Sequence, residues 1–76
     1  MTLDRIPKDS TALVVSVDGS GASTLRLMEM GVVPGAQVRV VKSAPLGDPI
    51  QICLRNHYLA LRRNEAQAVT VAMCKD

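Results

Sequence analysis

The sequence has almost no aromatic residues: it contains no Phe and no Trp, and Tyr58 is its single Tyr. Small barrels that bind single-stranded nucleic acid stack the bases on several aromatic side chains within a basic groove. One tyrosine provides no such surface, and a formal net charge of +2 is too small to attract nucleic acid or an anionic membrane. We therefore expect no nucleic-acid partner and a core built from aliphatic side chains.

Long apolar runs are also missing. No run approaches the roughly 20 residues needed to span a bilayer, and the first ten residues, "MTLDRIPKDS", lack the apolar segment of a secretory signal. These features predict a cytoplasmic protein without direct membrane insertion. Cys53 and Cys74 are the two cysteines, and a reducing cytosol favours free thiols over a disulfide.

Side chains that could carry chemistry are few. His57 is the single histidine and is expected in a hairpin turn, where no carboxylate orients it for catalysis. The segment "DGSGAST" lacks the third glycine of a dinucleotide-binding turn and the lysine of a P-loop, so it favours a plain turn before a helix. The candidate metal ligands Cys53, His57 and Cys74 lack the close paired spacing of structural zinc ligands. We predict no enzyme, no cofactor and no dedicated metal site.

The pattern along the 76 residues predicts one mainly β domain. An apolar run at 12–17 predicts a buried strand, and alternating runs predict strands at 37–42, 50–55 and 58–63, with a last strand at 68–73. Pro34-Gly35 suits a type II turn, and Asn56-His57 is expected to form a hairpin turn. "NEAQA" predicts a single helical turn capped by Asn64. About five strands with one or two short helices, joined by short turns, indicate a closed or nearly closed SH3-like β-barrel.

A short helix is expected at 22–30, with Ser20 or Ser23 as its cap and Gly31 at its end. At about 100° per residue, Leu27 and Met30 lie on one side of this helix, whereas Leu25 and Met28 lie on another. Only one pair can face a small barrel. The other pair is either exposed for contact with a protein partner or covered by wrapping loops, and the sequence leaves both alternatives open.

The segment "SAPLGDPIQI", residues 43–52, contains an unusually stiff connection between two strands. Pro45 and Pro49 restrict its two ends, and Gly47 permits a positive φ at its apex. Asp48 can accept a hydrogen bond from a nearby backbone N–H, and Leu46 is expected at the tip. Such a preorganised loop either lowers the entropic cost of binding a partner or only fixes the register of the strands.

Three segments together, "LRLMEMGVVPGAQVRVV", "APLGDPIQI" and "LALRRNEA", resemble the FeoA family over residues 13–71. The chain departs from the family pattern at Asn56-His57, where a glycine is common, and Asn can fill that role. The matching positions are Leu27, Met30, Gly31, Pro34, Gly35, Ala44, Pro45, Leu46, Gly47, Asp48, Pro49, Ile50, Leu59, Ala60, Leu61, Arg62, Glu65 and Ala66.

The resemblance implies a single SH3-like FeoA domain over residues 1–76 and a non-catalytic role in bacterial ferrous iron uptake. The implied partner is FeoB, a membrane ferrous-iron transporter with a cytoplasmic GTPase domain, which would hold this protein at the inner face of the membrane. Candidate partner-binding residues are Leu25, Met28, Leu46 and Asp48, and weak self-association stays open. The alternative is a metal-responsive regulatory domain, like the SH3-like C-terminal domain of metal-dependent repressors.

Overall fold

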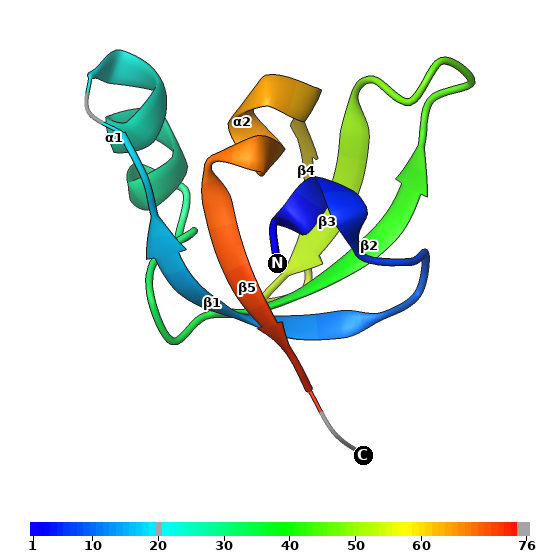
Figure 1. Ribbon diagram of the computed structural model, residues 1–76, viewed down its shortest axis with the longest axis horizontal. Helices are drawn as coiled ribbons and strands as arrows, with labels where there is room; N and C mark the ends of the chain where they lie inside the picture. Colours follow the sequence, from blue (N-terminus) through cyan, green and yellow to red (C-terminus); the bar gives the residue numbers. More distant parts are fainter. Residues whose placement is uncertain (20, 75–76) are drawn as a thin grey trace.

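The computed structural model describes residues 1–19 and 21–74 (Figure 1). Five antiparallel strands form one curled sheet in the order β4-β3-β2-β1-β5. They are β1 (Thr11–Val17), β2 (Gln37–Ser43), β3 (Ile50–Leu54), β4 (His57–Leu61) and β5 (Val69–Met73). Helix α1 (Ala22–Glu29) follows β1, α2 (Arg63–Gln67) connects β4 to β5, and a short 3-10 helix, η1 (Leu3–Arg5), precedes β1.

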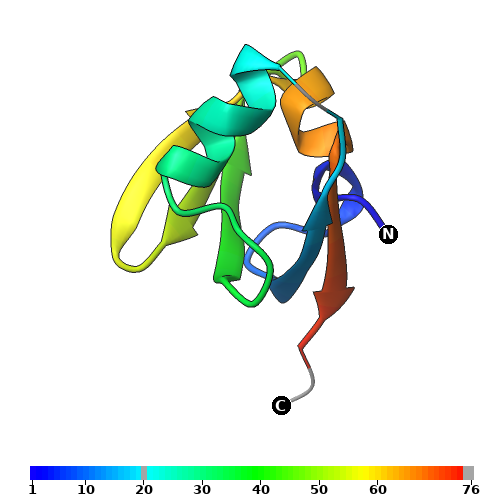
Figure 2. The same ribbon diagram turned by 90° about the vertical axis from the view of Figure 1, so that its left-hand side faces the viewer.

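The curled sheet is a barrel that stays open between its two outer strands. β4 and β5 pair with β3 and β1 respectively and not with each other, and α2 links them across the opening (Figures 1 and 2). The expected mainly β architecture, with five strands and two short α-helices, is confirmed. None of the helices in residues 1–19 and 21–74 has the length and apolar character needed to cross a membrane.

Strand alternation decides which side chains enter the barrel. In β2 and β3 buried residues alternate with neighbours in sequence that are partly or fully exposed; the buried residues are Val38 and Val40 in β2 and Ile50, Ile52 and Leu54 in β3. The prediction of a buried strand at 12–17 is wrong in one respect: β1 also alternates, and Leu13 and Val15 are 44% and 53% exposed. An antiparallel sheet can keep one face in water, so an apolar run alone does not establish burial on both faces.

The core is entirely aliphatic, as expected from the missing aromatic residues. Its largest fully buried side chains include Leu27 of α1, Ile52 of β3 and Leu61 of β4. Two core residues, Leu3 and Ile6, come from the N-terminal segment for which the sequence predicted no element. The full set is Leu3, Ile6, Ala12, Val14, Leu27, Val32, Ala36, Val38, Val40, Ile50, Ile52, Leu54, Leu61, Ala66, Val69 and Val71.

Two turn predictions have different outcomes. The type II turn at Pro34-Gly35 is confirmed, because Gly35 has a φ of 92° and the Ala36 N–H donates to the Val33 carbonyl at 3.0 Å. The β3–β4 turn lies one residue earlier than expected. Arg55 and Asn56 occupy it with φ angles of 51° and 67°, and His57 is the first residue of β4.

The helix caps also differ from the prediction. α1 begins after Gly21 with no side-chain cap, and Ser23 lies inside the helix, while Ser20 falls outside the described residues. Gly31 ends α1 as expected, with a φ of 103°. Asn64 is not the cap of α2, because that helix begins one residue before it, after Arg62.

Candidate functional site

The β2–β3 connection, residues 44–49, is fixed by hydrogen bonds at its base and at its apex. The Ala44 N–H donates to the Pro49 carbonyl at 3.0 Å, and the Gly47 N–H donates to the Ala44 carbonyl at 2.7 Å. Gly47 has the expected positive φ, 82°, and the peptide bond between Asp48 and Pro49 is cis. The two backbone hydrogen bonds give the loop a defined conformation, and its preorganisation for a partner stays a prediction.

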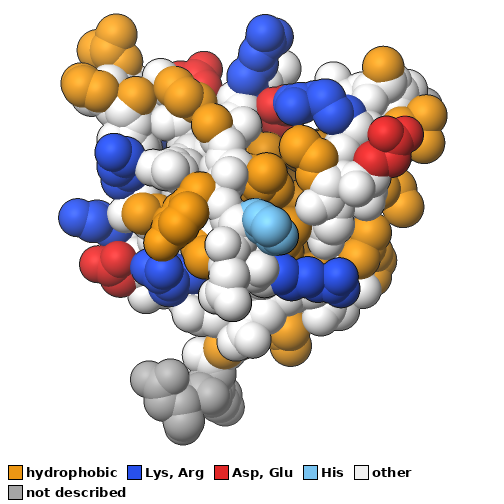
Figure 3. Space-filling view, turned by 180° about the vertical axis from the view of Figure 1, so that it is seen from behind, with side chains coloured by type: hydrophobic (Ala, Val, Ile, Leu, Met, Phe, Trp, Pro, Cys, Tyr) orange, Lys and Arg blue, Asp and Glu red, His pale blue; other side chains and the backbone are white. Residues whose placement is uncertain are grey.

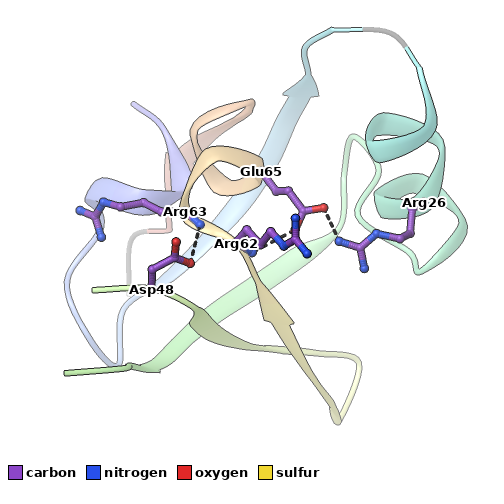
Figure 4. A network of polar contacts seen from close by, with 5 residues as sticks. All are labelled: Arg26, Asp48, Arg62, Arg63 and Glu65. Atoms are coloured by element: carbon purple, nitrogen blue, oxygen red, sulfur yellow. Dashed lines mark hydrogen bonds and ion pairs between the residues drawn. The ribbon is translucent and has the colours of Figure 1, made fainter. Parts of the chain in front are cut away.

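Two further contacts tie this loop to α2. Asp48 Oδ1 accepts a hydrogen bond from the Arg63 backbone N–H at 3.0 Å, which Figure 4 shows. The Arg63 side chain donates to the Gly47 carbonyl at 2.9 Å. Asp48 thus accepts a backbone N–H, as predicted, and it holds the loop against the start of α2.

Leu46 is 96% exposed at the loop tip. A leucine so exposed contributes almost nothing to the core, and the backbone contacts that close the loop do not involve its side chain. The structure therefore confirms the expected position of Leu46, and its contact with a partner stays a prediction.

Helix α1 presents the second exposed apolar element. Leu27 is buried and Met30 packs against the core, whereas Leu25 and Met28 are 59% and 42% exposed. Leu25 and Met28 are therefore exposed and are not covered by wrapping loops. In Figure 3 hydrophobic side chains gather at both upper corners of the molecule, over α1 and over the β2–β3 loop.

The carboxylate of Glu65, 5% exposed, joins α1 to α2. Glu65 accepts a hydrogen bond from the Arg62 backbone N–H at 2.9 Å and forms an ion pair with the Arg26 guanidinium of α1 (Figure 4). Burial raises the pKa of this carboxyl, but the hydrogen bonds from Arg26 and Arg62 and their positive charges outweigh it, so the pKa lies below its usual value of 4.5.

The candidate metal ligands do not form a joint site. In the register of the β3–β4 hairpin Cys53 lies opposite Tyr58 and Leu54 opposite His57, so Cys53 and His57 belong to opposite faces of the sheet. Cys74 follows β5, and its Sγ lies 4.0 Å from Gln37 Nε2. Both cysteines are free. No group of three or more potential ligands occurs in residues 1–19 and 21–74.

Sequence reasoning missed the Arg26–Glu65 pair. The two residues lie 39 positions apart in the sequence. A pattern of neighbouring residues cannot predict a contact over such a separation. A weak local signal existed, because Glu65 stands three residues after Arg62, as in a capping box. A Ser or Thr normally marks the first position of that motif, and here Arg62 occupies it.

The fold and these elements define a class of protein. It is a small, open, antiparallel β-barrel of five strands, with an exposed apolar loop and an exposed apolar helix side that are both anchored to α2. The family model described as the FeoA domain matches residues 1–73. The chain belongs to the FeoA family.

Two solved structures support the family and the fold. FeoA from Chlorobium tepidum is 40% identical, with 99% of this chain and 71% of that chain covered and a TM-score of 0.92. FeoA from Stenotrophomonas maltophilia, described as a procaryotic SH3 domain protein and complexed with zinc, is 37% identical over 95% of this chain and 89% of that chain, with a TM-score of 0.84. The expected SH3-like fold is therefore confirmed.

One curated relative contains a similar domain within a much longer polypeptide. It is a fusion protein of Fe(2+) transport protein A and the Fe(2+) transporter FeoB from Porphyromonas gingivalis, 34% identical over 73 residues. The match covers 96% of this chain and 9% of the relative. This chain thus spans only a small part of the curated relative that it matches.

Proposed function

We propose that this protein docks on a FeoB-type ferrous-iron transporter at the cytoplasmic face of the membrane, and that it supports or regulates the transporter through its GTPase domain. The main support is the Porphyromonas gingivalis relative, in which a similar domain and a FeoB transporter share one polypeptide. Fusion gives two domains a high effective concentration, and this is useful when separate chains have to meet.

The exposed apolar elements supply the contact chemistry in this proposal. Leu46 projects from the β2–β3 loop, and Leu25 and Met28 project from α1. Burying one leucine side chain contributes about 1.5–3 kcal/mol, so truncating one is expected to weaken binding about tenfold or more. Asp48 acts in this proposal by holding the loop in its binding conformation, since it accepts the Arg63 N–H.

The test is calorimetric titration of the protein with the cytoplasmic domain of a FeoB-type transporter from the same cells, with and without guanine nucleotide. Leu46→Ala and the double variant Leu25→Ala/Met28→Ala are expected to bind at least tenfold more weakly than wild type. Leu13→Ala is the matched control, because Leu13 is 44% exposed on the outer face of β1. No binding under either nucleotide condition, or equal weakening by the control, would contradict the proposal.

A metal-responsive regulatory role is the alternative from the sequence. No observation on the described residues favours it over docking, and titration of the reduced protein with Fe²⁺ or Zn²⁺ tests it directly.

A further inference from the structure

The two outer strands of the sheet, β4 and β5, differ in whether another segment covers their free edge. The N-terminus covers the edge of β5, because Thr2 forms a β-bridge with Thr70 and the Val71 N–H donates to the Met1 carbonyl at 2.8 Å. On the free side of β4, no other strand of the described residues pairs with it. An uncovered edge strand is a template for a further strand, and proteins usually protect such edges.

The register identifies which backbone groups face that open side. The two-residue turn at Arg55-Asn56 is closed by the pair Leu54 and His57, and the pair that closes such a turn exchanges hydrogen bonds. Bonded and non-bonded pairs then alternate along an antiparallel hairpin. Tyr58 and Ala60 are at non-bonded positions, so their N–H and C=O groups point away from β3. Both residues are exposed, Tyr58 by 60%.

Two adjoining hollows, together called the groove, lie near this edge. One hollow of about 430 Å³ lies between α1 and the end of β4 and is lined by Arg26, Arg62 and Glu65, among others. A second hollow, of about 360 Å³, lies over the outer face of β2 and β3 and includes Lys42 and Pro45. Pro49 and Ala60 line both hollows, so the two hollows adjoin at the end of β4.

The charges of this groove are unequal. Its charged lining residues are Arg26, Arg62, Lys42 and Glu65. Because Arg26 and Glu65 are paired with each other, Arg62 and Lys42 leave the groove with an excess of positive charge. The surface between them is formed by small or apolar residues, Ala60 and Pro49 among them. A basic rim over a small-residue floor complements an extended segment with acidic side chains.

We propose that an extended acidic segment of a partner protein adds as a sixth strand along β4. Its backbone bonds to the free groups of Tyr58 and Ala60, and its carboxylates approach Arg62 and Lys42. Main-chain pairing then gives affinity, and the basic side chains give selectivity. The inference rests on the proposed docking on a FeoB-type transporter, whose cytoplasmic part would carry the segment.

A blocked peptide of alternating valine and glutamate, seven residues long, serves as the probe, with glutamine and lysine versions as matched peptides. The glutamate peptide is expected to bind at least tenfold more tightly than the glutamine peptide, and added salt should weaken it because the contacts are partly exposed. It should also slow hydrogen exchange at the Tyr58 and Ala60 amides. Equal binding of the glutamate and glutamine peptides, or no slowing at these amides, overturns the inference.

Variants of the full chain separate the backbone contribution from the charge contribution. Ala60→Pro removes an N–H that faces away from β3, so it should leave the fold intact and weaken the peptide at least tenfold. Arg62→Gln and Lys42→Gln should each weaken it severalfold. Lys8→Gln, which removes an exposed positive charge from the N-terminal segment, is the control and should leave binding unchanged. A circular-dichroism spectrum and melting curve verify that each variant folds, and Tyr58→Pro gives a second edge variant should Ala60→Pro not fold.

The same variants separate this inference from the proposed function. If the transporter domain binds wild type and Ala60→Pro equally, strand addition is wrong and docking survives. If the glutamate peptide binds but the transporter domain does not, docking is wrong and the acidic-strand site survives. Slowed exchange at Tyr58 and Ala60 that depends on protein concentration, without peptide, would assign the edge to a second copy of this chain and overturn the inference.

Discussion

The ion pair between α1 and α2 gives the sharpest test of how this small fold is held together. Glu65→Gln keeps the size of the side chain and an oxygen that can accept the Arg62 N–H, but it removes the negative charge that faces Arg26. A hydrogen bond between charged groups contributes about 1.5–3 kcal/mol. The Arg26 side chain is 50% exposed, so water compensates part of the loss, and we expect the lower end of that range.

A loss of about 1.5 kcal/mol corresponds to a decrease in Tm of about 6–12 °C for a domain of this size. Glu65→Ala also leaves the Arg62 N–H without its acceptor, which adds about 1 kcal/mol. Urea and thermal unfolding followed by circular dichroism measure both changes. The control is Glu29→Gln. Glu29 is exposed and lies at the end of α1, the helix that also carries Arg26, so this substitution should change the free energy of unfolding little.

The pH dependence supplies the decisive observation. The pKa of Glu65 in the folded protein lies below its usual value of 4.5. Its charge therefore stabilises the fold fully above that value, and this contribution is lost as the pH falls through the folded pKa. Because glutamine does not titrate, the stability gap between wild type and Glu65→Gln should shrink between about pH 5 and pH 3. A gap that stays constant over this range, or one no larger than that of Glu29→Gln, refutes the reasoning.

Two further predictions concern the core and metal binding. Leu27→Ala should lower the free energy of unfolding by about 2–5 kcal/mol, and Leu25→Ala by less than about 0.5 kcal/mol, because Leu27 is 1% exposed and Leu25 is 59% exposed; equal losses in urea unfolding would contradict the assignment of the two sides of α1. Titration of the reduced protein with Fe²⁺ or Zn²⁺ by calorimetry should give no tight stoichiometric binding, since Cys53 and His57 belong to opposite sheet faces. A tight one-to-one complex would favour the metal-responsive regulatory domain.

Local backbone requirements are the part of this fold that the sequence predicts well. Gly31 and Gly47 both have the expected positive φ, and Gly35 takes the position that a type II turn requires. Alternation also identifies the inward residues of β2 and β3. Each of these signals depends on a few neighbouring residues, so it can be identified from a short stretch of sequence.

The missed features depend on contacts between distant segments or on a residue in a rare conformation. Arg55 adopts a φ of 51°, a region that arginine seldom occupies, so the sequence predicts the turn one residue later than it lies. Leu3 and Ile6 lie in a segment without periodicity, and only contact with the barrel shows that they belong to the core. The same reason explains why the open edge of β4 could not be predicted: it follows from the sheet order and from the place of the N-terminus on β5.

The candidate contact elements share one support, the start of α2. Asp48 holds the β2–β3 loop by accepting the Arg63 N–H, and Glu65 holds α1 through Arg26 while it accepts the Arg62 N–H. The carboxylates of Asp48 and Glu65 thus bind two consecutive backbone N–H groups just after β4. Through them, the β2–β3 loop and α1 are both held against the start of α2. A binding surface fixed in this way loses less conformational entropy on association than one carried by independent loops. In the proposed docking, α2, a helix of five residues, holds both contact elements in place although it contributes no exposed apolar side chain of its own.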